Sequence, residues 1–79
     1  MDLTKKMKEY LEREYKDAEE LIKRHPSWIK TRQDERVVID RIISRCLGVV
    51  MFAQTCGVSY EECAVYDEYK EKLEKLLDN

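Results

Sequence analysis

The sequence predicts an all-α protein, a three-helix antiparallel bundle with a long central helix and a tight hairpin between the second and third helices. Apolar residues recur at helical spacing over three segments, and helix-capping residues stand between these segments. The chain holds only two Gly and one Pro in 79 residues, which is typical of a compact helical protein. This length makes one domain over residues 1–79, near the small end of independent folding.

The first predicted helix covers about residues 3–24. Its apolar positions recur at steps of three or four: Leu3, Met7, Leu11, Tyr15, Ala18 and Ile22. Pro26 ends the helix, because its ring fixes the backbone and it has no N–H to donate. Residues 25–30 form a short linker, so the first two helices should be antiparallel neighbours. Trp28 and Ile29 are too apolar for a free loop, and we expect them to fold back over the end of the core.

The second predicted helix covers about residues 31–56. Thr31 can cap its start, and Gly57 is a natural left-handed stop. From Cys46 to Ala53 the sequence is Cys-Leu-Gly-Val-Val-Met-Phe-Ala, without charge or a strongly polar group. On a helix these residues make more than two turns, so the helix is apolar on every side there and must be covered on every side.

The third predicted helix covers about residues 60–77. Ser59 fits a capping box, with the side chain of Glu62 reaching back to the cap. Only Gly57 and Val58 separate the end of the second helix from this cap. So short a connection predicts the tight hairpin between the second and third helices. Residues 58–79 hold three Lys and seven acids, a local net charge of −4, so the third helix carries an acidic surface.

The overall composition argues against a strong electrostatic attraction to nucleic acid or to membranes. The net charge is −2, so no whole-protein field draws the chain onto nucleic acid or an anionic membrane. The longest apolar run is far shorter than the roughly 20 residues that a bilayer span requires. An odd number of cysteines without a secretory signal favours a reducing, cytoplasmic setting.

The candidates for metal or redox chemistry are few. Cys46, Cys56, Cys63 and the single His25 could ligate a metal, but no cysteine pair has the close spacing of a zinc knuckle. Free cysteines are most often small core residues, and that is the favoured interpretation. A redox pair at Cys56 and Cys63, or a cysteine-based metal site, stays open as an alternative. No catalytic set or nucleotide-binding loop is present, so we expect neither an enzyme nor a cofactor.

Four arginines mark a candidate polyanion-binding surface on the second helix. They are Arg32, Arg36, Arg41 and Arg45. They could contact a phosphate backbone, and a dimeric nucleic-acid-binding regulator is therefore an alternative function. The acidic third helix would be repelled by phosphate, so a solvated surface is favoured over this alternative.

The surplus of apolar residues on the second helix gives the leading hypothesis. Two neighbouring helices each offer one narrow apolar stripe, which leaves part of the second helix without cover. The predicted self-association or partner-binding residues are Leu47, Val50, Met51, Phe52 and Trp28. Large exposed apolar patches usually mark interfaces, and a twofold homodimer is the commonest way to bury one. The sequence thus favours a small cytoplasmic interaction protein that binds protein as a homodimer, such as an adaptor or an inhibitor of the kind encoded by phages and mobile elements.

Overall fold

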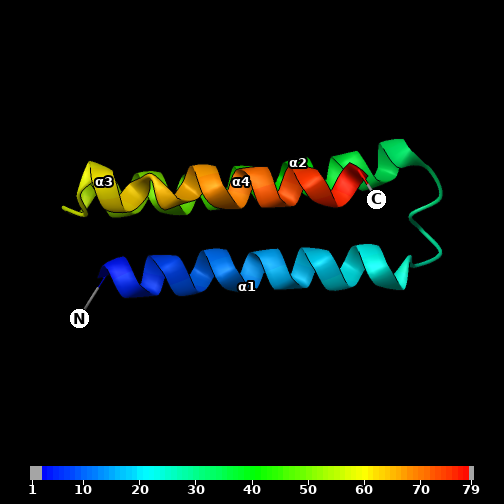
Figure 1. The fold of residues 1–79 in the computed structure, drawn as a ribbon, viewed down its shortest axis with the longest axis horizontal. Coiled ribbons are helices and arrows are strands. Elements are labelled where there is room, and N and C mark those ends of the chain that lie inside the picture. The colour runs from blue at the N-terminus through cyan, green and yellow to red at the C-terminus, as the bar shows by residue number, and fades with distance from the viewer. Residues whose placement is uncertain (1–2, 79) are drawn as a thin grey trace.

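The computed structural model describes residues 3–78, and this part of the chain is helical throughout apart from short connections. The helices are α1 (Leu3–Arg24), α2 (Arg32–Thr55), α3 (Tyr60–Cys63) and α4 (Val65–Lys75), followed by the 3₁₀ turn η1 (Leu76–Asp78). Figure 1 shows α2 returning against the direction of α1, and α4 running in the same direction as α1. The all-α helical bundle predicted from the sequence is confirmed.

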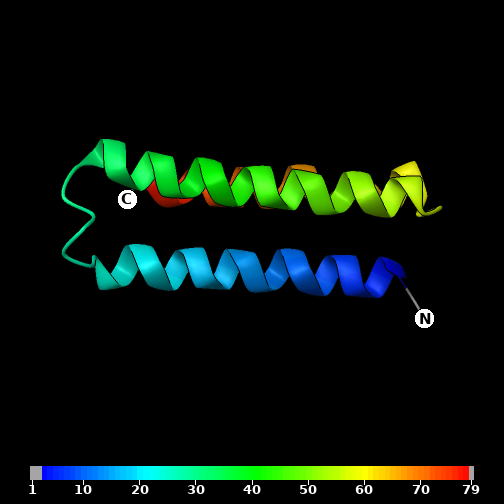
Figure 2. The ribbon, with the colours of Figure 1, turned by 180° about the vertical axis from the view of Figure 1, so that it is seen from behind.

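The bundle is elongated, with extents of 41 × 18 × 16 Å. Seen from behind, α2 lies in front of α4 and above α1 (Figure 2). Each of the three long helices therefore packs on the other two, and each keeps one side turned outward.

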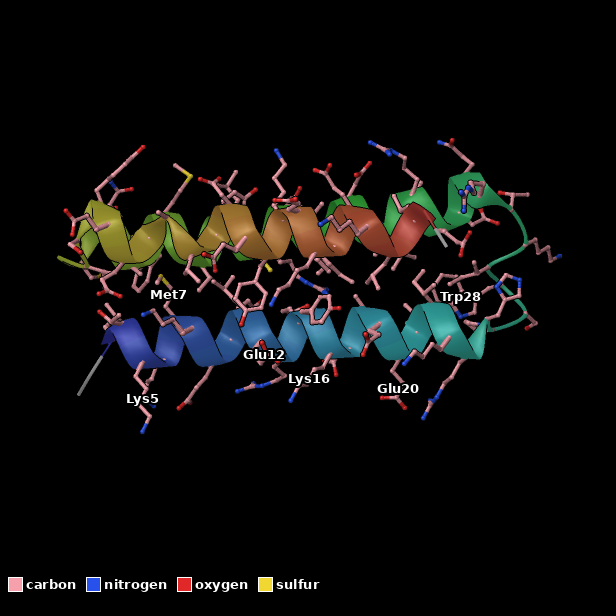
Figure 3. The ribbon with its side chains drawn as sticks, viewed as in Figure 1. Lys5, Met7, Glu12, Lys16, Glu20 and Trp28 are labelled. Atoms are coloured by element: carbon pink, nitrogen blue, oxygen red, sulfur yellow. The ribbon has the colours of Figure 1, made fainter. Side chains whose placement is uncertain are left out.

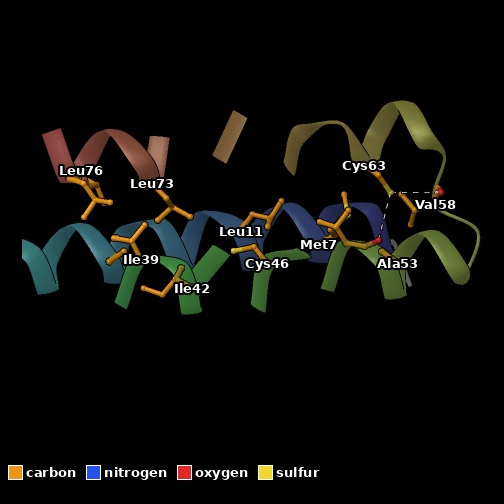
Figure 4. Packing of buried hydrophobic residues seen from close by; sticks show 13 residues of the cluster. Met7, Leu11, Ile39, Ile42, Cys46, Ala53, Val58, Cys63, Leu73 and Leu76 are labelled. Atoms are coloured by element: carbon orange, nitrogen blue, oxygen red, sulfur yellow. Dashed lines mark hydrogen bonds between the residues drawn. The ribbon is translucent and has the colours of Figure 1, made fainter. Parts of the chain in front are cut away.

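The core fills the space between the three helices along their full length. The apolar stripe of α1 contributes Met7, Leu11 and Ala18, which are buried. The buried residues of α2 are Ile39, Ile42, Cys46, Val50 and Ala53, and those of the C-terminal arm are Cys63, Leu73, Leu76 and Leu77. Figure 4 shows these side chains meeting in one cluster. Burial of large apolar side chains contributes about 1.5–3 kcal/mol each, so this cluster provides the main stabilisation.

Both ends of α2 carry the local signals expected from the sequence. Thr31 Oγ1 accepts a hydrogen bond from the Asp34 backbone N–H at 3.1 Å, and Asp34 Oδ2 accepts one from the Thr31 N–H at 3.1 Å. At the other end, Gly57 has a φ of +105°, the left-handed conformation that favours glycine. The Val58 N–H then reaches the Ala53 carbonyl at 3.0 Å, which turns the chain sharply into α3.

The arm from residue 60 to residue 78 differs from a single regular helix. It is divided at Ala64, whose N–H is shared between the Tyr60 and Glu61 carbonyls at 3.1 and 3.3 Å. Ser59 Oγ caps the Glu62 N–H at 3.2 Å, as expected. The Glu62 carboxylate does not complete the expected capping box, because it pairs instead with Lys8 of α1 at 2.7 Å. A full positive charge across the bundle is a stronger partner than a backbone amide.

Of the two linker residues that were expected to cover the end of the core, only one is buried. Ile29 is buried at 2% exposure, whereas Trp28 is 57% exposed. The expectation for Trp28 is therefore corrected. The Ile29 N–H bonds to the Pro26 carbonyl at 2.9 Å, and this tight turn directs Ile29 inward, leaving its neighbour outside.

Candidate functional site

The largest exposed apolar side chains of α2 lie together in its C-terminal half. Leu47, Met51 and Phe52 are 41%, 58% and 65% exposed, and Gly48 lies between them on the same outward side. We call these four residues the apolar belt. Val50, which the sequence grouped with them, is buried at 5% exposure and belongs to the core. Val50 is buried because the rotation of about 100° per residue places it on the same inward side of α2 as Cys46 and Ala53.

A groove of about 310 Å³ lies beside the apolar belt, between α2 and the start of the C-terminal arm. Its α2 side is formed by Leu47, Val50, Met51 and Gln54. Its other side is formed by Tyr60, Cys63, Ala64, Tyr66 and Asp67. Apart from Gln54, Asp67 and the two tyrosine hydroxyls, the lining is apolar, as in most sites that accept an apolar side chain. Val50 thus contributes to the groove even though it is buried.

Packing within the chain does not explain why residue 48 is a glycine. A Cβ atom added at this position would meet nothing within 4 Å. Glycine in a helix interior is about 1 kcal/mol less favourable than alanine, so its place in the middle of a long helix is destabilising. A glycine on an exposed helix surface does allow a second helix to approach closely. The apolar belt, with Gly48 at its centre, is therefore the candidate site.

Trp28 lies at the linker end of the molecule (Figure 3), whereas the apolar belt lies toward the end of α2 that joins α3. The structure does not bring this residue together with Leu47, Met51 and Phe52. An exposed Trp is still a frequent interface residue, but Trp28 belongs to a different part of the surface.

The four arginines of α2 are exposed, and two of them are engaged by carboxylates. Arg45 donates to Glu14 of α1 at 2.9 Å, and Arg36 lies 4.0 Å from Asp40. Arg32 and Arg36 are separated from Arg41 by about 140° or more around the helix, because each residue adds about 100°. A polyanion would meet these side chains on two different sides of α2. Polyanion binding stays a prediction from the sequence.

The three cysteines are free and lie in different environments. Cys46 is buried, and burial raises the pKa of its thiol to about 11. Cys63 is also buried, and its Sγ lies 3.9 Å from the Val50 carbonyl and 4.0 Å from that of Val58 (Figure 4). Cys56 is exposed at the end of α2. Within residues 3–78, no three side chains of His, Cys, Asp or Glu converge in a way that could hold a metal ion.

One polar cluster, which was not predicted from the sequence, joins α1 to α4. The Tyr69 hydroxyl donates to the Glu12 carboxylate, which raises the pKa of Tyr69 to about 12 and lowers the pKa of Glu12. The Lys72 ammonium lies 4.9 Å from the centre of the Tyr69 ring and 5.7 Å from that of Tyr15. Cation–π contacts of this kind stabilise helix packing, so the cluster fixes α4 against α1. A Tyr and a Lys three residues apart on one helix were the available signal.

None of the helices in the described part of the chain combines the length and apolar character that crossing a membrane requires.

No protein-family model matches this chain, and no significant similarity to a curated protein or to a solved structure is found.

Proposed function

We propose that this chain is a small non-enzymatic interaction protein that binds a second copy of itself through the outward side of α2. The observation that carries the proposal is the apolar belt with Gly48 at its centre. The side chains of Leu47, Met51 and Phe52 are the three most exposed large apolar side chains of α2, and Val37 is exposed to a similar extent as Leu47. Contiguous exposed apolar patches on small proteins are most often interfaces.

The small size of the chain also supports self-association. A chain of 79 residues buries a smaller fraction of its surface than a larger domain, so a shared interface adds appreciably to its stability. The exposed glycine supports a partner that presents a helix, because the absence of a side chain lets another backbone come close. A dimer formed in this way leaves the acidic surface of α4 and the charged side of α1 free for a further protein. An adaptor or inhibitor role, in a reducing cytoplasm that suits three free cysteines, fits such a dimer.

Solution mass under reducing conditions tests the proposal. We expect a dimer by light scattering for the wild type and a folded monomer for Phe52→Glu, because the dimer would bury an unpaired charge at this position. The matched control is Trp28→Glu, which replaces another exposed aromatic residue at the other end of the molecule and should leave the dimer intact. A wild-type monomer at high micromolar concentration contradicts self-association. Dissociation by both variants would show that the effect is one of net charge rather than of the apolar belt.

A further inference from the structure

We infer that the two copies pack with their α2 helices side by side and parallel, related by a twofold axis that runs along α2, so that Phe52 of each copy enters the groove of the other. This inference rests on the proposed function, because it presupposes self-association through α2. It adds the orientation of the two chains and the occupant of the groove.

The outward side of α2 has two unlike flanks. Each residue adds about 100° around the helix, so the midline of the outward side passes between Ser44 and Gly48. Residues on one side of this midline turn toward α1, and residues on the other side turn toward α4. Arg41 and Phe52 lie on the α1 flank, together with Arg45, which pairs with Glu14 of α1. The α4 flank carries Leu47 and Met51, which line the groove, and Asp40 lies on the same flank.

Only one twofold arrangement brings the unlike flanks together. A twofold axis parallel to α2 keeps every residue at the same level along the helix. The α1 flank of one copy then faces the α4 flank of the other at that level. A twofold axis perpendicular to α2 reverses the direction of the helix. The α1 flank of one copy then faces the α1 flank of the other, and the two α4 flanks face each other. In both cases residue i contacts residue j while j contacts i, as a twofold interface requires. Complementarity between the flanks therefore decides the orientation.

Shape complementarity favours the parallel pair. Phe52 is 65% exposed and projects from the α1 flank, at the level of the residues of α2 that line the groove on the α4 flank. The groove measures about 310 Å³, and the small side chain of Ala64 is part of its lining on the side of the C-terminal arm. A cavity of about 150 Å³ suffices for benzene, so the ring of Phe52 fits. An antiparallel pair would place groove against groove and leave both without an aromatic occupant.

Charge complementarity favours the same orientation. Arg41 has no ionic partner among residues 3–78, and Asp40 is held only loosely, 4.0 Å from Arg36. In the parallel pair Arg41 of one copy lies opposite Asp40 of the other, and the twofold axis forms this contact twice. Asp67 at the edge of the groove lies in turn toward the partner's Arg45. An antiparallel pair centred on Gly48 would separate Arg41 from the partner's Asp40 by about 22 Å along the helix.

The size of the outward side suits a second copy of the chain. α2 has 24 residues and is about 36 Å long, and the bundle is 18 Å wide. A face of these dimensions approaches the roughly 800 Å² per partner that a stable protein–protein interface buries. The midline residues Val37, Ser44, Gly48 and Thr55 are small or of medium size, so the two helices can approach over this whole length.

Distances between spin labels test the orientation. The label is attached at Ser27→Cys in a Cys56→Ser background, because Ser27 is exposed and outside the interface, while Cys46 and Cys63 are buried. A parallel dimer places both labels at the same end, so we expect a separation below twice the 18 Å width of one chain. An antiparallel dimer places them at opposite ends, about 40 Å apart or more. A long separation in a dimer overturns the inferred orientation and leaves the proposed self-association intact.

A variant that fills the groove tests its occupant. Ala64→Phe blocks the groove from within the same chain, and we expect the dimer dissociation constant to rise at least tenfold. The control is Glu20→Phe, which adds the same ring on the exposed side of α1 away from the groove and should leave the constant within twofold. Circular dichroism establishes that both variants remain folded. Equal dissociation constants for Ala64→Phe and the wild type would overturn the placement of Phe52, whereas a monomeric wild type would overturn the proposed function together with it.

Discussion

Replacing Gly48 by alanine should have opposite effects on the isolated chain and on the dimer. In the isolated chain the added Cβ meets nothing within 4 Å, so the change only improves the helix. A helix-interior alanine is favoured over glycine by about 1 kcal/mol. For a domain of this size a gain of about 1 kcal/mol raises the melting temperature by about 4–8 °C. We expect this increase at protein concentrations where the chain is monomeric.

In the dimer the same position lies between two helices, and an added side chain separates them. Gly48→Leu is the stronger form of the test, because leucine has nearly the helix propensity of alanine but a much larger side chain. Overpacking a close contact typically costs about 1–3 kcal/mol, and each 1.4 kcal/mol corresponds to a tenfold change in affinity. We therefore expect Gly48→Leu to weaken the dimer by about five- to 150-fold while the monomer becomes more stable.

Two measurements separate these effects. Thermal unfolding followed by circular dichroism over a range of protein concentrations gives the stability, and sedimentation equilibrium gives the dissociation constant. Glu20→Leu is the control, since it places leucine on the exposed side of α1 and should leave the dissociation constant unchanged. If Gly48→Leu dimerises as tightly as the wild type and melts higher at every concentration, Gly48 does not lie at a helix contact and the reasoning is refuted.

Three further outcomes follow from the packing and the pKa shifts. Leu11→Ala should lower the free energy of unfolding by about 2–5 kcal/mol in a urea titration, because Leu11 is fully buried; a loss below about 1 kcal/mol would mean that the core is loose there. Backbone hydrogen bonds lower the pKa of Asp34 below its ordinary value of 3.8, so the stability that its charge provides is complete above that value and is lost as the pH falls through the folded-state pKa. Asp34→Asn should therefore be less stable than the wild type at neutral pH, and urea titrations across the acid range should show the difference disappearing; a constant difference would contradict this. Under native conditions at mildly alkaline pH a thiol reagent should modify Cys56 alone, since Cys46 is buried with a pKa of about 11 and Cys63 is also buried; rapid modification of all three would contradict the described core.

The helices and most of the core could be predicted because their signals are local and periodic. The apolar repeat of α1 leads to the three residues that are buried, Met7, Leu11 and Ala18. Thr31 and Gly57 mark the ends of α2 by backbone chemistry that depends on a few adjacent residues. Such signals do not depend on what packs against the helix.

The features that the sequence did not predict depend on contacts between distant segments. Glu62 was expected to close its own capping box, but the spacing within one helix cannot show that Lys8 lies opposite. Trp28 and Ile29 are adjacent apolar residues, and only the turn of the linker determines which one is buried. The sequence cannot rank two neighbours when both would gain from burial.

The candidate site lies between these two cases. The sequence indicated that α2 carries more apolar surface than two neighbouring helices can cover, and the exposure of Leu47, Met51 and Phe52 agrees with that surplus. It did not separate Val50 from them, because a stretch that is apolar on every side has no inward direction of its own. The groove that starts at Tyr60 also needed the structure, since residues on both sides of the turn form it.

The position of the single tryptophan determines what fluorescence can report about this protein. Trp28 is more than half exposed and lies at the linker, at the opposite end of the bundle from the apolar belt. Its emission should resemble that of tryptophan in water even in the native state, and it should change little when two copies associate. A fluorescence titration could therefore show no transition for a protein that dimerises tightly. Placing a new tryptophan at Phe52 in a Trp28→Phe background would move the only strong fluorophore to the proposed contact.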